Sequence, residues 1–183
     1  AMLAGFAHAE TLWSIGQKDN TYAELAIAGK YGDYTKSFPQ DVTFTTGKSK
    51  PDKDWPFIHP GPADAWAGTR EHPFRIEFDL KRIPKGACRM LIQSVGAQSG
   101  GPVVLEVNVN DSMRRSVTFQ PGKGDAVLTD PKAGRPATQA FLLPASALCR
   151  GHNVITLTVT DGSWLLYDAI SLASVNVKGP EVA

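Results

Sequence analysis

Regular alternation of apolar and polar side chains is the feature of this sequence that most constrains its fold. In FRIEFDL (Phe74–Leu80) every second residue is apolar and the residues between are charged. Successive side chains of a β-strand point to opposite faces, so this pattern is typical of a strand with one buried face. The segments 103–109 and 155–159 alternate in the same way. The chain is therefore predicted to fold mainly into β-strands.

Shorter stretches with strand character bring the expected total to nine or ten strands. They are Leu12–Ile15, Tyr22–Ile27, Asp41–Thr46, Cys88–Val95, Arg115–Phe119, Gln139–Leu143 and Trp164–Ala173. The best helical signal is a single turn at 144–148, and no segment between strands fits the helical crossover of a parallel sheet. Seventeen glycines and thirteen prolines favour many turns. We predict an all-β fold, an antiparallel jelly-roll β-sandwich.

The charge balance and the absence of known motifs exclude several classes of function. Nineteen Lys and Arg stand against eighteen Asp and Glu, with no basic block, so no nucleic-acid partner is expected. No apolar run approaches the roughly 18–20 residues of a membrane span, so no membrane partner is expected. GxSxG, HExxH, GxGxxG and P-loop motifs are missing from the sequence. We expect a monomer that is not itself an enzyme.

The two cysteines, Cys88 and Cys149, leave two possibilities open. A bridge between them would close a loop of roughly 60 residues and stabilise the fold by ~4 kcal/mol in the chain-entropy account. Two unpaired thiols are the simpler expectation. No CxxC pair or zinc-ligand spacing is present.

The first ten residues are set apart from the fold. Small residues at Ala7 and Ala9 fit either the end of a signal peptide or a linker. The β-sandwich is therefore expected to span residues 11–177, with a short tail at 178–183.

One irregular segment, from Gly47 to His72, carries the side chains that we consider for ligand binding. A loop of this length is uncommon unless it is functional or disordered, and its aromatic residues argue against disorder. Sugar rings stack an apolar face on Trp or Tyr, while their hydroxyls and carboxylates need polar partners. The predicted ligand-binding residues are Trp55, His59, Asp64, Trp66 and Arg70, with Tyr34 from a neighbouring loop. Two alternatives remain: the tryptophans plug the end of the sandwich, or a sheet face binds the ligand instead.

A carboxylate interrupts the apolar row of the last predicted strand. Asp168 lies between Leu166 and Ile170 in that row. A buried carboxylate costs several kcal/mol unless it is paired or bound to a metal. One alternative is that Asp168 forms a salt bridge or accepts hydrogen bonds, for instance from Arg75 or Arg89. Glu24 is a possible neighbour, because the first and last strands of a jelly roll often lie close together.

Several long blocks of this sequence resemble one known family. They are LWSIGQKDNTYAEL (12–25), DWPFIHPGPADAWAG (54–68) with the following HPFRIEFDL, ATQAFLLPASAL (137–148) and GSWLLYDAISL (162–172). They are similar to the C-terminal, carbohydrate-binding-like domain of rhamnogalacturonan lyases of polysaccharide lyase family 4, which has a galactose-binding-like jelly roll. The resemblance covers nearly all of residues 12–175. In those lyases a separate N-terminal β-sandwich carries the catalytic residues, and a fibronectin-type domain lies between.

The resemblance implies an accessory module rather than an enzyme. The module would bind plant cell-wall polysaccharide, above all pectic polysaccharide, and hold a covalently linked catalytic domain there, in a secreted, extracellular or periplasmic protein. Related sandwiches hold a structural Ca²⁺ between an acidic residue near the first strand and one in the last strand, positions that Glu24 and Asp168 match. Two other interpretations stay open. One is a structural buttress without sugar binding, and the other is a small lyase or hydrolase with His59 or His72 as a base.

Overall fold

The structure is a computed structural model that describes residues 9–175. Its strands are β1 Ala9–Gly16, β2 Val42–Thr45, β3 Ile58–His59, β4 Phe74–Leu80, β5 Cys88–Ala97, β6 Val103–Val109, β7 Met113–Phe119, β8 Ala137–Leu143, β9 Gly151–Asp161 and β10 Leu165–Val175. Its short helices are η1 Tyr31–Asp33, α1 Tyr34–Ser37, α2 Pro51–Asp54, η2 Ala65–Ala67, η3 Asp125–Leu128, η4 Pro131–Ala133 and η5 Ala145–Ala147.

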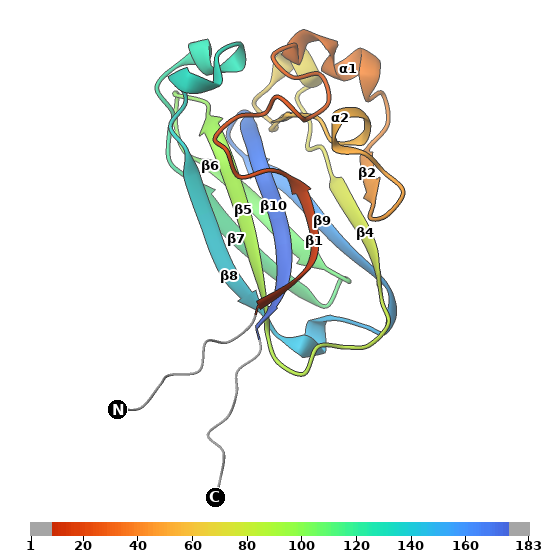
Figure 1. Cartoon of the computed structure of the whole chain (residues 1–183). Coiled ribbons are helices and arrows are strands. Elements are labelled where there is room, and N and C mark those ends of the chain that lie inside the picture. The colour runs from red at the N-terminus through yellow and green to blue at the C-terminus, as the bar shows by residue number, and fades with distance from the viewer. Residues whose placement is uncertain (1–8, 176–183) are drawn as a thin grey trace, which may run out of the picture.

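Two five-stranded sheets enclose one hydrophobic core (Figure 1). The first sheet has the order β1-β10-β5-β8, with β3 added beside β10. The second has the order β2-β4-β9-β6-β7. In β4 the apolar residues Phe74, Ile76 and Phe78 are buried while Arg75 is exposed, as the alternating pattern predicts. The predicted β-sandwich is confirmed.

Two predictions about the strands are wrong. The segment 22–27 forms turns, in which Leu25 N–H donates to the Tyr22 carbonyl and Ile27 adopts a positive φ of 53°. A left-handed residue breaks the extended path that a strand needs. The sheets are also not wholly antiparallel, since β2 runs parallel to β4 with Val42 opposite Phe74. The 28 residues between those two strands supply the long crossover that parallel pairing requires.

The first and last described strands meet at one end of the sandwich. Ala9 pairs with Val175, so residues 9 and 10 belong to β1 and the predicted boundary at residue 11 is corrected. The predicted leader at 1–8 and the tail at 178–183 lie outside the described residues. Figure 1 shows α1 and α2 at the opposite end, above the sheets.

Three further expectations concern the described part of the chain. Both cysteines are free, with Cys88 buried on β5 and Cys149 exposed, so the expectation of unpaired thiols holds. The predicted helical turn near residue 146 is present as η5. Among residues 9–175, no helix has the length and apolar character that crossing a membrane would require.

Candidate functional site

Two aromatic side chains reach the surface at the helical end of the sandwich. Tyr31 of η1 is 40% exposed, and Trp66 of η2 is partly buried against the core. Their ring centroids lie 5.4 Å apart with the planes at 79°, an edge-to-face contact. We call Tyr31 and Trp66 the aromatic pair. Tyr31 was not among the predicted ligand-binding residues, because its segment shows no pattern that separates a surface ring from a buried one.

Asp64 fixes the position of Trp66. Its carboxylate accepts hydrogen bonds from the Gly61 N–H at 2.8 Å, from the Trp66 indole N–H at 3.0 Å and from the Ser163 hydroxyl. The Asp64 carbonyl also accepts from the Thr69 N–H at 2.9 Å, where the chain turns back through left-handed residues. A buried carboxylate with several donors is strongly held. Asp64 therefore positions the indole and is not itself free to bind a ligand, which corrects its predicted role.

The loop before Asp64 is locked against the turn between β9 and β10. Ala63 N–H donates to the Gly162 carbonyl at 3.1 Å. A Cβ atom at Gly61 would lie 2.6 Å from the Ser163 carbonyl oxygen, closer than real contacts allow. Only glycine permits this approach. The aromatic pair thus rests on a rigid support, and rigidity lowers the entropic cost of binding.

Arg70 adds a cation to the same end of the molecule. Its guanidinium lies 3.4 Å from the exposed Asp41 carboxylate and donates to the Glu71 carbonyl at 2.9 Å. An exposed ion pair of this kind holds its partners weakly, by about 0–1 kcal/mol. Arg70 is therefore available to a ligand carboxylate or hydroxyl, and its binding role stays a prediction.

Trp55 is placed in the core and not at the surface. It is 0% exposed, and its ring meets Phe44 at 6.2 Å, Phe74 at 5.3 Å and Tyr167 at 5.5 Å between centroids. Its indole N–H has no hydrogen-bond partner. No face of this ring can stack on a sugar. The prediction that Trp55 binds ligand is wrong, and the alternative that this tryptophan plugs the sandwich describes it correctly.

His59 and Tyr34 are also buried, in one hydrogen-bonded network. His59 Nε2–H donates to the His72 carbonyl at 2.6 Å, so its Nδ1 accepts from the Tyr167 hydroxyl at 2.7 Å. His72 Nε2–H donates to the Ala67 carbonyl at 3.0 Å, so its Nδ1 accepts from the Tyr34 hydroxyl at 3.3 Å. Each neutral imidazole thus has one donor and one acceptor in use.

Burial sets the protonation state of this network. Loss of solvation lowers the pKa of His59 to about 3, and burial also lowers the pKa of His72. Burial raises the pKa of the Tyr34 hydroxyl, which therefore stays a donor. A ligand reaches neither His59 nor Tyr34, so both predicted binding roles are corrected. The same burial keeps His59 and His72 away from any substrate as bases.

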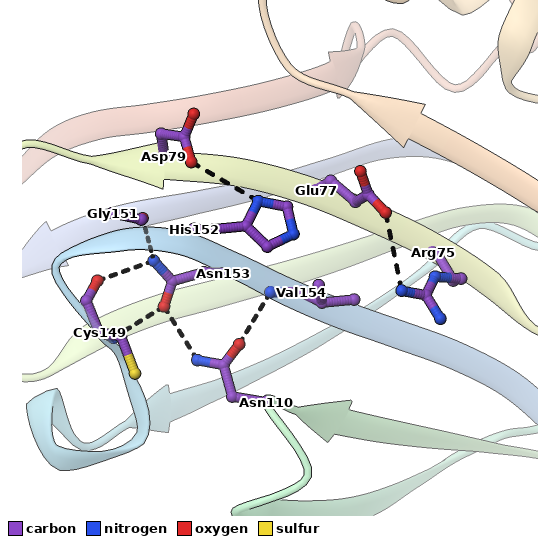
Figure 2. Close-up of polar contacts among 9 residues, drawn as sticks. All are labelled: Arg75, Glu77, Asp79, Asn110, Cys149, Gly151, His152, Asn153 and Val154. Atoms are coloured by element: carbon purple, nitrogen blue, oxygen red, sulfur yellow. Dashed lines mark hydrogen bonds and ion pairs between the residues drawn. The ribbon is translucent and has the colours of Figure 1, made fainter.

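The second sheet offers a polar cavity on its outward face. It has a volume of about 280 Å³ and is lined by Arg75, Asn108, Asn110, Asp111, Cys149, Val154 and Thr156. Figure 2 shows that Asn110 and its buried neighbour Asn153 already have partners. Asn110 donates to Asn153 Oδ1 and the Ala147 carbonyl and accepts from the Val154 N–H. Asn153 binds the backbone of Cys149 at both its N–H and its carbonyl.

This network is structural rather than a binding site. It ties the turn after β6 to β9 and to the loop after η5. Arg75 lies 3.6 Å from Glu77, as Figure 2 also shows. No aromatic ring lines the cavity. The helical end, where two rings are accessible, is therefore the better candidate site.

Glu24 Oε1 and the backbone carbonyl oxygen of Asp168 both lie beside Gly16, although Glu24 lies in a turn and not in a strand. Asp168 is buried. It has no partner residue on β5, because the pairing of β10 with β5 shifts register between Tyr167 and Ala169. Its Oδ1 accepts from the Asp19 N–H at 3.2 Å, and Glu24 Oε1 accepts from the Gln17 N–H at 2.6 Å. Neither carboxylate forms an ion pair with a side chain of residues 9–175, so the alternative of Arg75 or Arg89 fails.

Only glycine allows the chain to approach these oxygen atoms so closely. Gly16 has a φ of +77°, and a Cβ atom there would lie 3.3 Å from Glu24 Oε1 and would collide with the Asp168 carbonyl oxygen. Carboxylate and carbonyl oxygens are the kinds of ligand that Ca²⁺ takes. Burial raises the pKa of Asp168, so an uncompensated charge there is costly. No third acidic, His or Cys side chain joins them within the described residues, so carbonyl oxygens and water would complete the shell.

The chain is similar to several known proteins. Among solved structures, a family GH115 4-O-methyl-alpha-glucuronidase matches with a TM-score of 0.48 and 11% sequence identity. The match covers 96% of this chain and 19% of the glucuronidase chain. Another is a family 35 carbohydrate binding module from Clostridium thermocellum, with a TM-score of 0.37, 20% identity, 58% of this chain and 71% of that chain.

A curated relative is closer in sequence. A rhamnogalacturonate lyase of Dickeya dadantii (strain 3937) is 29% identical over 168 residues, which are 87% of this chain and 27% of the relative. The chain thus spans about a quarter of that enzyme's length. The family model described as "CBM-like: Polysaccharide lyase family 4, domain III" matches residues 11–172. The chain belongs to this family of carbohydrate-binding-module-like domains.

Proposed function

We propose that this domain is a non-catalytic carbohydrate-binding module, which holds an attached polysaccharide-degrading enzyme on pectic polysaccharide of the plant cell wall. The observation that carries the proposal is the aromatic pair with Arg70 beside it, on loops fixed by Asp64. An accessible indole offers a surface for the apolar face of a sugar, and a guanidinium offers planar donors for its polar groups. The relative's name, rhamnogalacturonate lyase, supports the pectic ligand.

The position of the aromatic pair suits an accessory role. It lies at the end of the sandwich opposite Ala9 and Val175, so a domain joined at either of those strands leaves it accessible (Figure 1). Burial of His59 and His72 supports a role without catalysis, because a general base has to reach its substrate. Plant polysaccharide lies outside cells, so the module would act in a secreted protein, as a monomer linked to its catalytic domain.

Trp66→Ala is the variant that tests this assignment. We expect the affinity for neutral pectic galactan oligosaccharides to fall at least tenfold, because truncation of a central aromatic contact commonly costs 2 kcal/mol or more. Isothermal titration calorimetry measures the change. The fold should persist, since Trp66 is only partly buried.

Leu142→Ala is the matched control for Trp66→Ala. Leu142 is 55% exposed on β8, so this variant also removes an exposed apolar side chain but leaves the aromatic pair intact. Its affinity should equal that of the natural sequence. Unchanged affinity in Trp66→Ala, with the fold verified by its unfolding transition, would refute the loop-end site.

We also propose that Glu24 and Asp168 hold a structural Ca²⁺. The ion would offset the charge of the buried Asp168 carboxylate and tie the turn at residues 17–24 to β10. A ligand that binds only the folded state at about 100 times its Kd stabilises by roughly 2.7 kcal/mol. For a domain of this size, that corresponds to a rise in Tm of about 5–10 °C.

Thermal unfolding with Ca²⁺ and with EDTA tests the calcium proposal. Ca²⁺ should raise the Tm of the natural sequence, EDTA should reverse the rise, and Asp168→Asn should abolish the response. Asp79→Asn, which neutralises an exposed carboxylate, should respond as the natural sequence does. Identical transitions in Ca²⁺ and EDTA would contradict the proposal and leave sugar binding unaffected.

A further inference from the structure

A groove lies at the other end of the sandwich from the aromatic pair. It has a volume of about 1030 Å³, and its walls are the start of β1, the end of β4, the turn between β4 and β5, and Ser174 of β10. This volume matches the upper range of ligand pockets, about 300–1,000 Å³. Figure 1 shows the turn between β4 and β5 at the lower end of the molecule, opposite α1 and α2.

Cations predominate along this groove. Lys81, Arg82 and Lys85 line it from the turn, and all three are exposed. None of them forms an ion pair with another residue in the range 9–175. Glu10 and Asp79 line the groove as well, and the Asp79 carboxylate lies 3.6 Å from His152 Nδ1. The groove therefore offers three uncommitted positive charges to an anionic ligand.

The surface between the cations is apolar. Leu12, Leu80, Ile83 and Pro84 line the groove, and Ile83 is 45% exposed, one of the few large apolar side chains at the surface. The turn that carries the cations is anchored, because Val175 N–H donates to the Ala87 carbonyl at 2.9 Å. The groove thus offers apolar side chains beside its charged ones.

A uronate sugar has the complementary chemistry. It has an apolar C–H face and a carboxylate that stays ionised at neutral pH, so it can pack on aliphatic side chains while its charge meets Lys or Arg. We propose that this groove binds a uronate-containing oligosaccharide. The inference rests on the proposed carbohydrate-binding function and adds a second site, of different chemistry, at the opposite end from the aromatic pair.

The experiment is calorimetric titration of the 183-residue protein with hexagalacturonate and, in parallel, with neutral β-1,4-galactohexaose. Hexagalacturonate should bind more weakly at an ionic strength of about 0.15 M than at 0.01 M, because salt screens exposed charges. The triple variant Lys81→Ala/Arg82→Ala/Lys85→Ala should bind hexagalacturonate at least tenfold more weakly. Its affinity for the neutral sugar should not change.

A matched triple variant separates a site from general charge. Lys123→Ala/Lys132→Ala/Arg135→Ala removes an equal number of positive charges at exposed positions that do not line the groove, and it should bind hexagalacturonate normally. The inference would be overturned if both triple variants lost the same affinity for hexagalacturonate. It would also be overturned if Arg70→Ala lost this affinity and the groove variant kept it. No hexagalacturonate binding by the natural sequence would overturn it as well.

The two proposals fail independently. Trp66→Ala should lose the neutral sugar and keep hexagalacturonate. Neutral binding that depends on Trp66 without any uronate binding would support the proposed function and refute the second site. Uronate binding at the groove without neutral binding would refute the role of the aromatic pair and leave the groove in place.

Discussion

Trp55→Ala is expected to lower the free energy of unfolding by about 3–5 kcal/mol, the range for aromatic residues removed from a core. Trp55 is fully buried, and it is in contact with Phe44, Phe74 and Tyr167 from three different strands. Alanine would leave a cavity where β2, β4 and β10 meet. Equilibrium unfolding in urea measures the loss from the transition midpoint at an unchanged slope.

The loss of unfolding free energy in Trp55→Ala should be compared with the loss in Trp66→Ala. Both tryptophans belong to the same irregular segment, but Trp66 is only partly buried and should lose less than half as much stability. Trp55→Phe should lie between, because it keeps a ring in place and removes an indole N–H that has no partner. Similar losses in Trp55→Ala and Trp66→Ala would contradict the assignment of one to the core and one to the surface.

Acid is expected to destabilise the fold through His59. The pKa of this imidazole is about 3 in the folded protein against 6.5 in its ordinary state. Below pH 6.5 the unfolded chain binds a proton that folded His59 does not, so stability is complete above pH 6.5 and falls as the pH drops toward 3. The loss approaches about 1.4 kcal/mol per pH unit and amounts to roughly 2 kcal/mol between pH 6.5 and 4.5.

His59→Gln isolates this contribution. Glutamine has a donor and an acceptor for the His72 carbonyl and the Tyr167 hydroxyl but does not titrate. The variant should show a flatter dependence of unfolding free energy on pH, with the part due to His72 remaining. His152→Gln is the control, because it makes the same replacement of histidine by glutamine at an exposed position. Equal slopes in the natural sequence and in His59→Gln would contradict the account.

The strands could be predicted from the sequence because their signal is periodic. Phe74 to Leu80 alternates without exception, and one face of the strand is buried as that pattern requires. Turns with positive φ have no such signal, so the segment 22–27 was predicted as a strand and Glu24 was placed in it. β3 has only two residues, which is too short to show a period.

The site could be predicted only in part. Trp66 is partly buried and Arg70 is exposed, so their predicted binding role stays open to test. Trp55, His59 and Tyr34 have the same residue types but fill the core, because β3 inserts beside β10 and carries this part of the segment inward. Residue type alone does not distinguish a ring that binds a sugar from a ring that packs. That difference depends on contacts such as the hydrogen bond of Ser163 to Asp64, which joins positions far apart in sequence.

The most direct test of the central claim is to measure retention of the purified 183-residue protein on an array of plant polysaccharides, with analysis of the supernatant for cleavage products. The account predicts retention by pectic galactan or rhamnogalacturonan without release of products. A blank across the array would contradict carbohydrate binding and favour a structural buttress. Release of unsaturated or reducing sugars by this protein alone would contradict the non-catalytic assignment.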